Sequence, residues 1–149
     1  MITAKWISPA ESEEDVNRED RGAHILRKSF ELPAAPRAAT LYATALGVYE
    51  AFINGVRVGD VELAPGSTSY DETLYAQEYD VAALLAPGPN RVEVVLSDGW
   101  FRGRNSGAQR RNVWGTKTAA LDQLDIDLGS GTWMTLGTGG DWLTLPSPI

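Results

Sequence analysis

Apolar and polar residues alternate along most of this chain, and turn-forming residues interrupt the alternation every few positions. The alternation is clearest in 48–53, 91–96 and 124–128, and 26–32 follows it with polar interruptions. Side chains of a β-strand point to the two faces of a sheet in turn, so a period of two predicts half-buried strands. Fifteen glycines and eight prolines separate these segments. The pattern therefore predicts an all-β fold, an antiparallel β-sandwich.

The turns between these segments have recognisable sequences. Asn54-Gly55 follows 48–53, and a tight hairpin turn needs positive φ at both central residues, which Asn and Gly tolerate. Gly129-Ser130-Gly131 predicts a second hairpin, between 124–128 and 132–136. Asp80 is expected to cap a single helical turn over 81–85, the one helical signal in the chain.

Composition excludes several classes of function. The chain has 149 residues, the length of a single domain, and contains no cysteine and one histidine, so disulfides, thiolate sites and multi-histidine metal sites are excluded. A net charge of −7 argues against a nucleic-acid partner. No apolar run approaches the roughly 20 residues of a membrane-spanning helix, so no membrane partner is expected. If Met1 is the native start, the absence of a secretory leader predicts a cytoplasmic location.

The sequence contains only weak matches to the residue patterns of known catalytic sites. A Ser-His-Asp triad would need His24, which has no nucleophile motif near it, and the glycines lie at turns rather than in a phosphate-binding loop. Paired carboxylates for glycoside cleavage are harder to exclude because the chain has 20 acids, although most of them lie at outward positions or in the acidic segment 11–20, expected to be a solvated loop. We expect this chain alone to have no catalytic activity.

Carbohydrate recognition fits the loops better. A sugar offers an apolar C–H face to a flat aromatic ring and paired hydroxyls to planar Asp, Asn or Arg side chains. Loop residues of these types are Tyr70, Asp71, Trp100, Asn105, Arg110, Asn112 and Trp114. Segment 102–117 holds five basic residues and no acid, which suits either a functional loop or counter-charge for the acidic surface. Trp100 and Trp114 are equally consistent with core packing, and for Trp6, Trp133 and Trp142 we expect packing in the core or at its rim.

A series of short motifs resembles the N-terminal β-sandwich domain of bacterial α-L-rhamnosidases. The motifs occur in the family's order: Gly47 to Gly55, Arg57 to Asp60, Leu63 to Gly66, Thr68 with Tyr70, Gln77 with Tyr79 to Val81, Leu84-Leu85, Pro87-Gly88 and Asp98 to Gly103. Trp6-Ile7 and the strand from Arg27 to Leu32 also match the opening of that domain. The resemblance covers nearly the whole chain.

The resemblance implies a jelly-roll, galactose-binding-like sandwich. Members of the family are inverting glycoside hydrolases that release terminal L-rhamnose, with their catalytic carboxylates on a separate (α/α) barrel that this chain lacks. The chain is thus expected to be one domain, 1–149, of a longer multidomain enzyme, cut before its last strand. Two functions follow: recognition of L-rhamnose-containing glycans, or a purely structural role packed on the barrel.

The resemblance also implies particular site residues. One related domain binds rhamnose with calcium through an acidic residue after a loop tyrosine, an aromatic residue in the Gly-Trp segment and an asparagine in the basic loop. By position these are Asp71 with Glu72, Trp100 and Asn112. The expected sugar site therefore comprises Tyr70, Asp71, Glu72, Trp100, Arg110, Asn112 and Trp114, with Asp71 and Asn112 as the expected calcium ligands.

Overall fold

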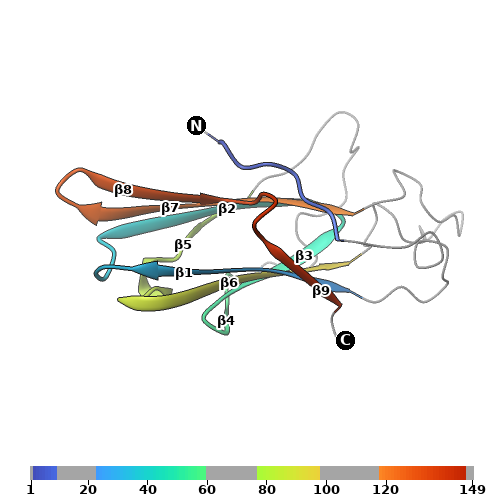
Figure 1. The fold of residues 1–149 in the computed structure, drawn as a ribbon, viewed down its shortest axis with the longest axis horizontal. Coiled ribbons are helices and arrows are strands. Elements are labelled where there is room, and N and C mark those ends of the chain that lie inside the picture. Colours follow the sequence, from blue (N-terminus) through green and yellow to red (C-terminus); the bar gives the residue numbers. More distant parts are fainter. Residues whose placement is uncertain (1, 10–22, 60–76, 98–117, 147–149) are drawn as a thin grey trace, which may run out of the picture.

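The fold is a sandwich of two antiparallel β-sheets (Figure 1). The structure is a computed structural model that describes residues 2–9, 23–59, 77–97 and 118–146. The elements are β1 (His24–Leu32), β2 (Ala38–Leu46), β3 (Val48–Ile53), β4 (Val56–Arg57), β5 (Gln77–Asp80), the 3-10 turn η1 (Ala82–Leu84), β6 (Gly88–Ser97), β7 (Ala119–Gly129), β8 (Thr132–Gly137) and β9 (Leu143–Pro146). One sheet has the order β4-β3-β6-β1-β9 and the other β5-β2-β7-β8. The predicted all-β sandwich is confirmed.

The period of two determines which residues form the core. On β3, Tyr49, Ala51 and Ile53 are buried between the sheets, whereas Glu50 on the alternate face is exposed. The same alternation places every second residue of β6 and β7 inside. The largest fully buried apolar side chains are Leu26, Leu41, Ile53, Val81, Val92, Val94, Leu96, Leu124 and Ile126. Burial of each stabilises the fold by roughly 1.5–3 kcal/mol.

Tight turns join the strands where glycine signals predicted them. Asn54 and Gly55 have φ of 51° and 81°, the positive values that a type I′ hairpin turn needs. Gly47 separates β2 from β3 with φ of 135°, and a Cβ there would lie 2.4 Å from the Ser97 carbonyl oxygen. The expected helical turn is present as η1, but its N-cap is Val81 rather than Asp80, with no side-chain capping bond; Asp80 Oδ1 instead accepts a hydrogen bond from Ala82 N at 3.3 Å.

The segment before residue 10 extends the four-stranded sheet. Backbone hydrogen bonds of 3.0 and 2.9 Å join Ile7 and Ala120 in both directions, beyond the point at which β8 ends opposite Gln123. The Gln123 side-chain carbonyl accepts the backbone N–H groups of Thr3 and Ala4 at 2.7 and 3.1 Å. The N-terminal segment therefore covers the edge of β7 that β8 leaves open.

The described tryptophans differ from one another. Trp142 is buried and donates its indole N–H to the Gly137 carbonyl at 3.0 Å, as expected for a core residue. Trp6 and Trp133 are 43% and 62% exposed, so the expectation of packing is wrong for Trp133 and holds for Trp6 only at the rim. Trp133 pairs with Asp127 and so lies on the outward face of the four-stranded sheet.

Candidate functional site

All seven residues expected to bind sugar lie outside the described residues. Tyr70, Asp71 and Glu72 belong to segment 60–76, and Trp100, Arg110, Asn112 and Trp114 to segment 98–117. The expected calcium ligands Asp71 and Asn112 are among them. The structure describes the residues that flank these two segments. Gly59 and Gln77 flank segment 60–76, and Ser97 and Thr118 flank segment 98–117.

The flanks of the first segment meet through tyrosines. Gly59 has φ of 72°, and a Cβ there would lie 2.5 Å from Tyr79 Cε1, so its backbone packs directly on the Tyr79 ring. The Tyr49 hydroxyl lies 3.0 Å from the Tyr79 hydroxyl and donates a hydrogen bond to Gln77 Oε1 at 2.6 Å. Tyr49 of the five-stranded sheet thus bonds across the sandwich to Gln77 and Tyr79 of β5, and Tyr79 in turn packs against Gly59, so the two flanks of segment 60–76 meet at Tyr79.

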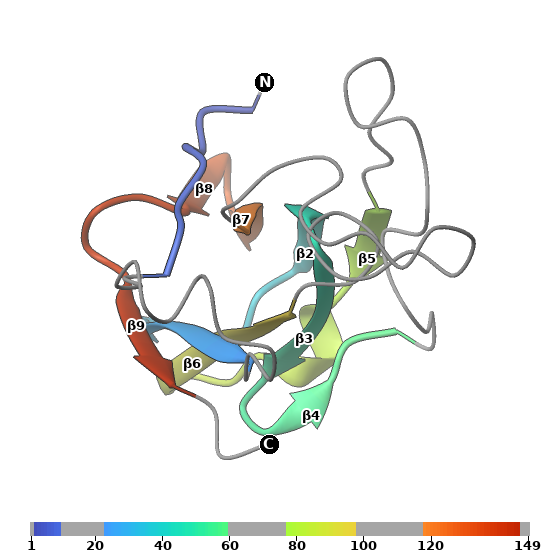
Figure 2. The same cartoon turned by 90° about the vertical axis from the view of Figure 1, so that its right-hand side faces the viewer.

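The flanks of the second segment meet at Gly47. An ideal Cβ on Gly47 would lie 2.4 Å from Ser97 O and 3.2 Å from Thr118 Cγ2, so only glycine lets these residues approach. The strand register agrees, because Val48 pairs with Ser97. We call this part of the sandwich the loop-anchoring end and define it by Gly47, Tyr49, Gly59, Gln77, Tyr79, Ser97 and Thr118. Figure 2 views the two layers from this end.

A buried acid lies behind these residues. Asp122 of β7 is 1% exposed, and neither of its carboxylate oxygens has a hydrogen-bond partner in the described part of the chain. Burial raises the pKa of Asp122 well above its ordinary value. Burial, the hydrogen bond with Tyr79 and the proximity of the ionisable groups of Tyr79 and Asp122 raise the pKa of Tyr49. The raised pKa values favour the neutral carboxyl of Asp122 and the neutral phenol of Tyr49, so both side chains suit hydrogen bonding or packing rather than nucleophilic attack.

The sequence pattern did not single out Asp122 or Tyr49 as site residues. Asp122 alternates with the same period as Ala120, Leu124 and Ile126, which are buried. A carboxyl at a position where the strand pattern expects an apolar side chain could have singled it out. Tyr49 also occupies an inward position, and nothing in its local sequence indicates that its hydroxyl reaches the opposite sheet.

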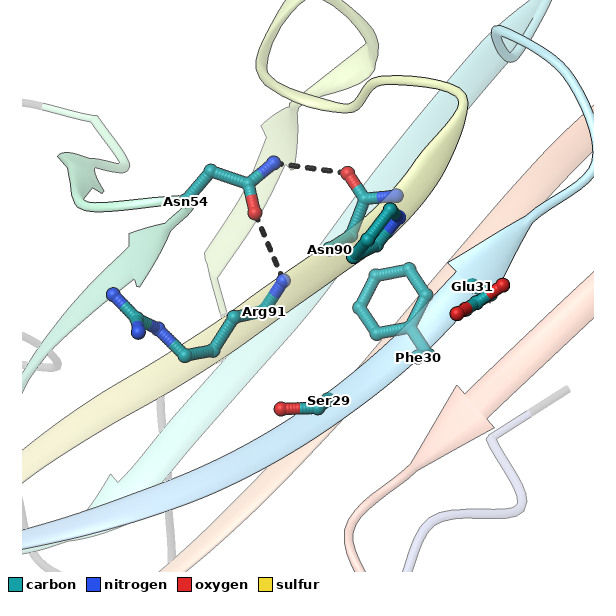
Figure 3. Close-up of a pocket in the computed structure, with 7 residues that line it drawn as sticks. Ser29, Phe30, Glu31, Asn54, Asn90 and Arg91 are labelled. Carbon is teal, nitrogen blue, oxygen red and sulfur yellow. Dashed lines mark hydrogen bonds between the residues drawn. The ribbon is translucent and has the colours of Figure 1, made fainter.

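A surface hollow of about 570 Å³ lies at the opposite end of β1 and β6 (Figure 3). Its lining residues are Ser29, Phe30, Glu31, Asn54, Pro89, Asn90 and Arg91. Asn54 Oδ1 accepts the Arg91 backbone N–H at 2.9 Å, and Asn54 Nδ2 donates to Asn90 Oδ1 at 2.9 Å. The Arg91 guanidinium lies 2.8 Å from Glu93 Oε1. Because these amides and this guanidinium are already paired within the sheet, the hollow is a structural junction rather than a prepared ligand site.

Metal and membrane features are absent from the described part of the chain. Its His, Asp and Glu side chains form no group of three that could hold a metal ion. Within the same ranges, no helix is long and apolar enough to cross a bilayer.

The fold and the anchored loop ends define the chain as a β-sandwich module. The family model described as the alpha-L-rhamnosidase N-terminal domain matches residues 34–149. The chain belongs to this family.

Named relatives agree with the family match. The chain is 41% identical over 128 residues to an alpha-L-rhamnosidase of Streptomyces avermitilis, covering 85% of this chain and 12% of that protein. A crystal structure of alpha-L-rhamnosidase from Aspergillus terreus superposes with a TM-score of 0.91 at 34% identity, covering 99% of this chain and 17% of that chain. The Streptomyces avermitilis enzyme complexed with L-rhamnose gives a TM-score of 0.82 at 40% identity, covering 86% and 12%. The chain therefore spans less than a fifth of the length of these relatives.

Proposed function

We propose that this chain is an accessory carbohydrate-recognition domain of an α-L-rhamnosidase-like glycoside hydrolase and binds L-rhamnose-containing glycans. One observation carries the proposal. The two segments that hold all seven candidate residues have their flanks fixed at one end of the sandwich, at Gly59 and Gln77 and at Ser97 and Thr118. Segments anchored together in this way can present their side chains to one ligand. Catalysis belongs to a separate (α/α) barrel.

The candidate residues supply the chemistry that a pyranose needs. The Trp100 or Trp114 ring would cover the C–H face of the sugar, and Asp71, Asn112 and Arg110 would bond its hydroxyls. Asp71 and Asn112 also offer the carboxylate and amide oxygens that Ca²⁺ prefers, and a bound calcium ion can leave coordination positions for sugar hydroxyls. The L-rhamnose in the complexed Streptomyces avermitilis enzyme supports this choice of ligand class.

Calorimetric titration of the chain with L-rhamnose tests the proposal, in calcium and after chelation. We expect saturable heat at millimolar sugar, and we expect Trp100→Ala to remove it by deleting the stacking ring. Trp133→Ala is the matched control, because Trp133 is 62% exposed on β8 and pairs with Asp127, far along β7 from Thr118.

The melting temperature of the Trp100→Ala variant distinguishes a binding role from a packing role. If Trp100 were a core residue, the substitution would lower the free energy of unfolding by about 3–5 kcal/mol. A folded wild-type chain that releases no heat at millimolar sugar, with or without calcium, would overturn the binding function.

A structural role is the second candidate, and exposed leucines favour it. Leu143 and Leu145 of β9 are 61% and 36% exposed on the outer face of the five-stranded sheet. Leu145 pairs with Ile25, which pairs with Val95, so an apolar row crosses three strands. Such a row suits packing against another domain, here the (α/α) barrel. A sugar titration without heat favours this candidate over the first.

A further inference from the structure

Asp122 occupies a position in the sandwich where a carboxylate has no evident structural use. It lies in one row across the four-stranded sheet with Ala43 of β2 and Gln77 of β5, because Ala43 pairs with both. Paired residues of antiparallel strands point to the same face, and Ala43 is buried in the core, so all three face inward. The Tyr49 hydroxyl lies over this row, 3.4 Å from the Ala43 carbonyl oxygen.

The backbone around Asp122 is fully paired, in contrast to its side chain. Asp122 N donates to Thr138 Oγ1 at 3.2 Å, and Asp122 O accepts from Thr138 N at 2.9 Å. Among the described residues, both carboxylate oxygens lack a hydrogen-bond partner, and so does the hydroxyl of Thr118, the residue just before β7. An ionised carboxylate in such a place is far more costly than a neutral one, because neither water nor a counter-charge solvates it.

The described groups that face the interior near Asp122 supply no cation for it. From β3 and β5 come the titratable hydroxyls of Tyr49 and Tyr79, and the inward face of β2 carries only alanines and Leu41. On β1, register places His24 and Lys28 on the inward face, opposite Leu96 and Val92. Lys28 Nζ lies 2.7 Å from Asp141 Oδ2 and is thereby paired.

We propose that Asp122 is a buried proton-binding site that couples the stability of the loop-anchoring end to pH. The neutral carboxyl is compatible with the closed sandwich, and the ionised carboxylate favours separation of the two sheets at this end. Tyr49 spans the sheets beside Asp122 and fixes Gln77 and Tyr79, so separation there releases the flanks of segment 60–76. The proposal does not depend on sugar binding.

The direction of the pH effect follows from proton linkage. Burial raises the pKa of Asp122 above the 3.8 of an ordinary aspartate, so the folded state holds a proton that the unfolded state releases. The stabilisation is complete below the unfolded pKa and is lost as pH rises towards the folded pKa. Across that window the folding equilibrium constant falls by up to about tenfold per pH unit. Partnered surface aspartates produce the opposite slope.

Urea unfolding of the chain from about pH 4.5 to about pH 8.5 tests the proposal. The ratio of the folding equilibrium constants of Asp122→Asn and wild type should increase with pH, by up to about tenfold per unit. Asp125→Asn is the matched control, because Asp125 lies on the outer face of the same strand and accepts a hydrogen bond from Thr135 Oγ1 at 3.0 Å. For this control, the corresponding ratio should not increase with pH.

Two results would overturn the proposal. In the first, Asp122→Asn retains the wild-type pH slope. In the second, the stability of the wild type relative to Asp122→Asn increases with pH. That result would show that the Asp122 carboxylate is ionised in the folded state and is stabilised by a bound cation or another counter-charge. The Asp122 side-chain ¹³C shift gives a reading that needs no variant. It should report a carboxyl that stays protonated well above the range of an ordinary aspartate, and titration in that ordinary range would contradict the proposal.

Discussion

Buried polar side chains in this sandwich fall into two kinds. Asn90 is 4% exposed, and each end of its amide is paired: its oxygen accepts from Asn54 Nδ2 and Ala86 N, and its nitrogen donates to the Ala86 and Gly88 carbonyls. Such a residue holds a turn together and has an obvious structural role. Asp122 is equally buried and has no such bonds. Of the described interior side chains without a partner, Asp122 and Thr118, Asp122 is the one with an ionisable group and so calls for a functional explanation.

Gly47 is the residue at which local conformation controls the anchoring of the loops. Gly47→Ala should destabilise the fold by more than about 2 kcal/mol, because it combines a strained positive φ with a clash against the Ser97 carbonyl oxygen. Urea unfolding measures the loss. Gly55→Ala is the control, since φ there is 81° but no atom lies within 4 Å of the new Cβ.

The control separates strain from crowding. Gly55→Ala should lose only the about 1–2 kcal/mol that the left-handed conformation costs. Equal losses in the two variants would mean that the approach of Gly47 to Ser97 and Thr118 is not tight.

At the level of strands, Thr138 joins the N-terminal segment to β7. Its hydroxyl donates to the Lys5 carbonyl at 2.6 Å and accepts from Asp122 N at 3.2 Å. Further backbone bonds link Lys5 N to Thr138 O and Ile7 to Ala120. A single hydroxyl therefore completes the hydrogen bonding of both the added segment and the strand that carries the buried acid.

Thr138→Val should lower the free energy of unfolding by about 1–3 kcal/mol, because valine has the same shape but leaves the Lys5 carbonyl and the Asp122 N–H unpaired. Denaturant unfolding gives the loss, and amide hydrogen exchange should show faster exchange at Ile7. Thr135→Val on the exposed face of β8 is the control and should change stability by less than about 1 kcal/mol. Unchanged exchange at Ile7 would contradict this role of Thr138.

The strands were predictable where their residues alternate. β3, β6 and β7 follow the period of two, and the turn at Asn54-Gly55 follows from its dipeptide. The pairing of Ile7 with Ala120 was not predictable, because a single bridge between residues so distant in the chain leaves no local pattern. Trp133 was misjudged because the alternation of β8 does not reveal which face lacks a covering layer.

For the molecule as a whole, the described sandwich fixes the flanks of the two segments that hold the proposed binding residues. The candidate binding residues come from a family resemblance and from loop chemistry, which strand periodicity cannot place. The structure contributes the anchors: Tyr49 with Gln77 and Tyr79, and Gly47 between Ser97 and Thr118. Ordered strands thus hold two long segments at one end, an arrangement typical of β-sandwich recognition modules.

The module has two ends, and L-rhamnose should distinguish them. Backbone amide NMR shifts recorded during a titration with L-rhamnose report on both at once. We predict saturable changes at the loop anchors, Gly59, Gln77, Ser97 and Thr118, and none around the hollow of Figure 3, at Ser29 and Asn54. Changes confined to that hollow, or no changes at millimolar sugar, would contradict recognition at the loop-anchoring end.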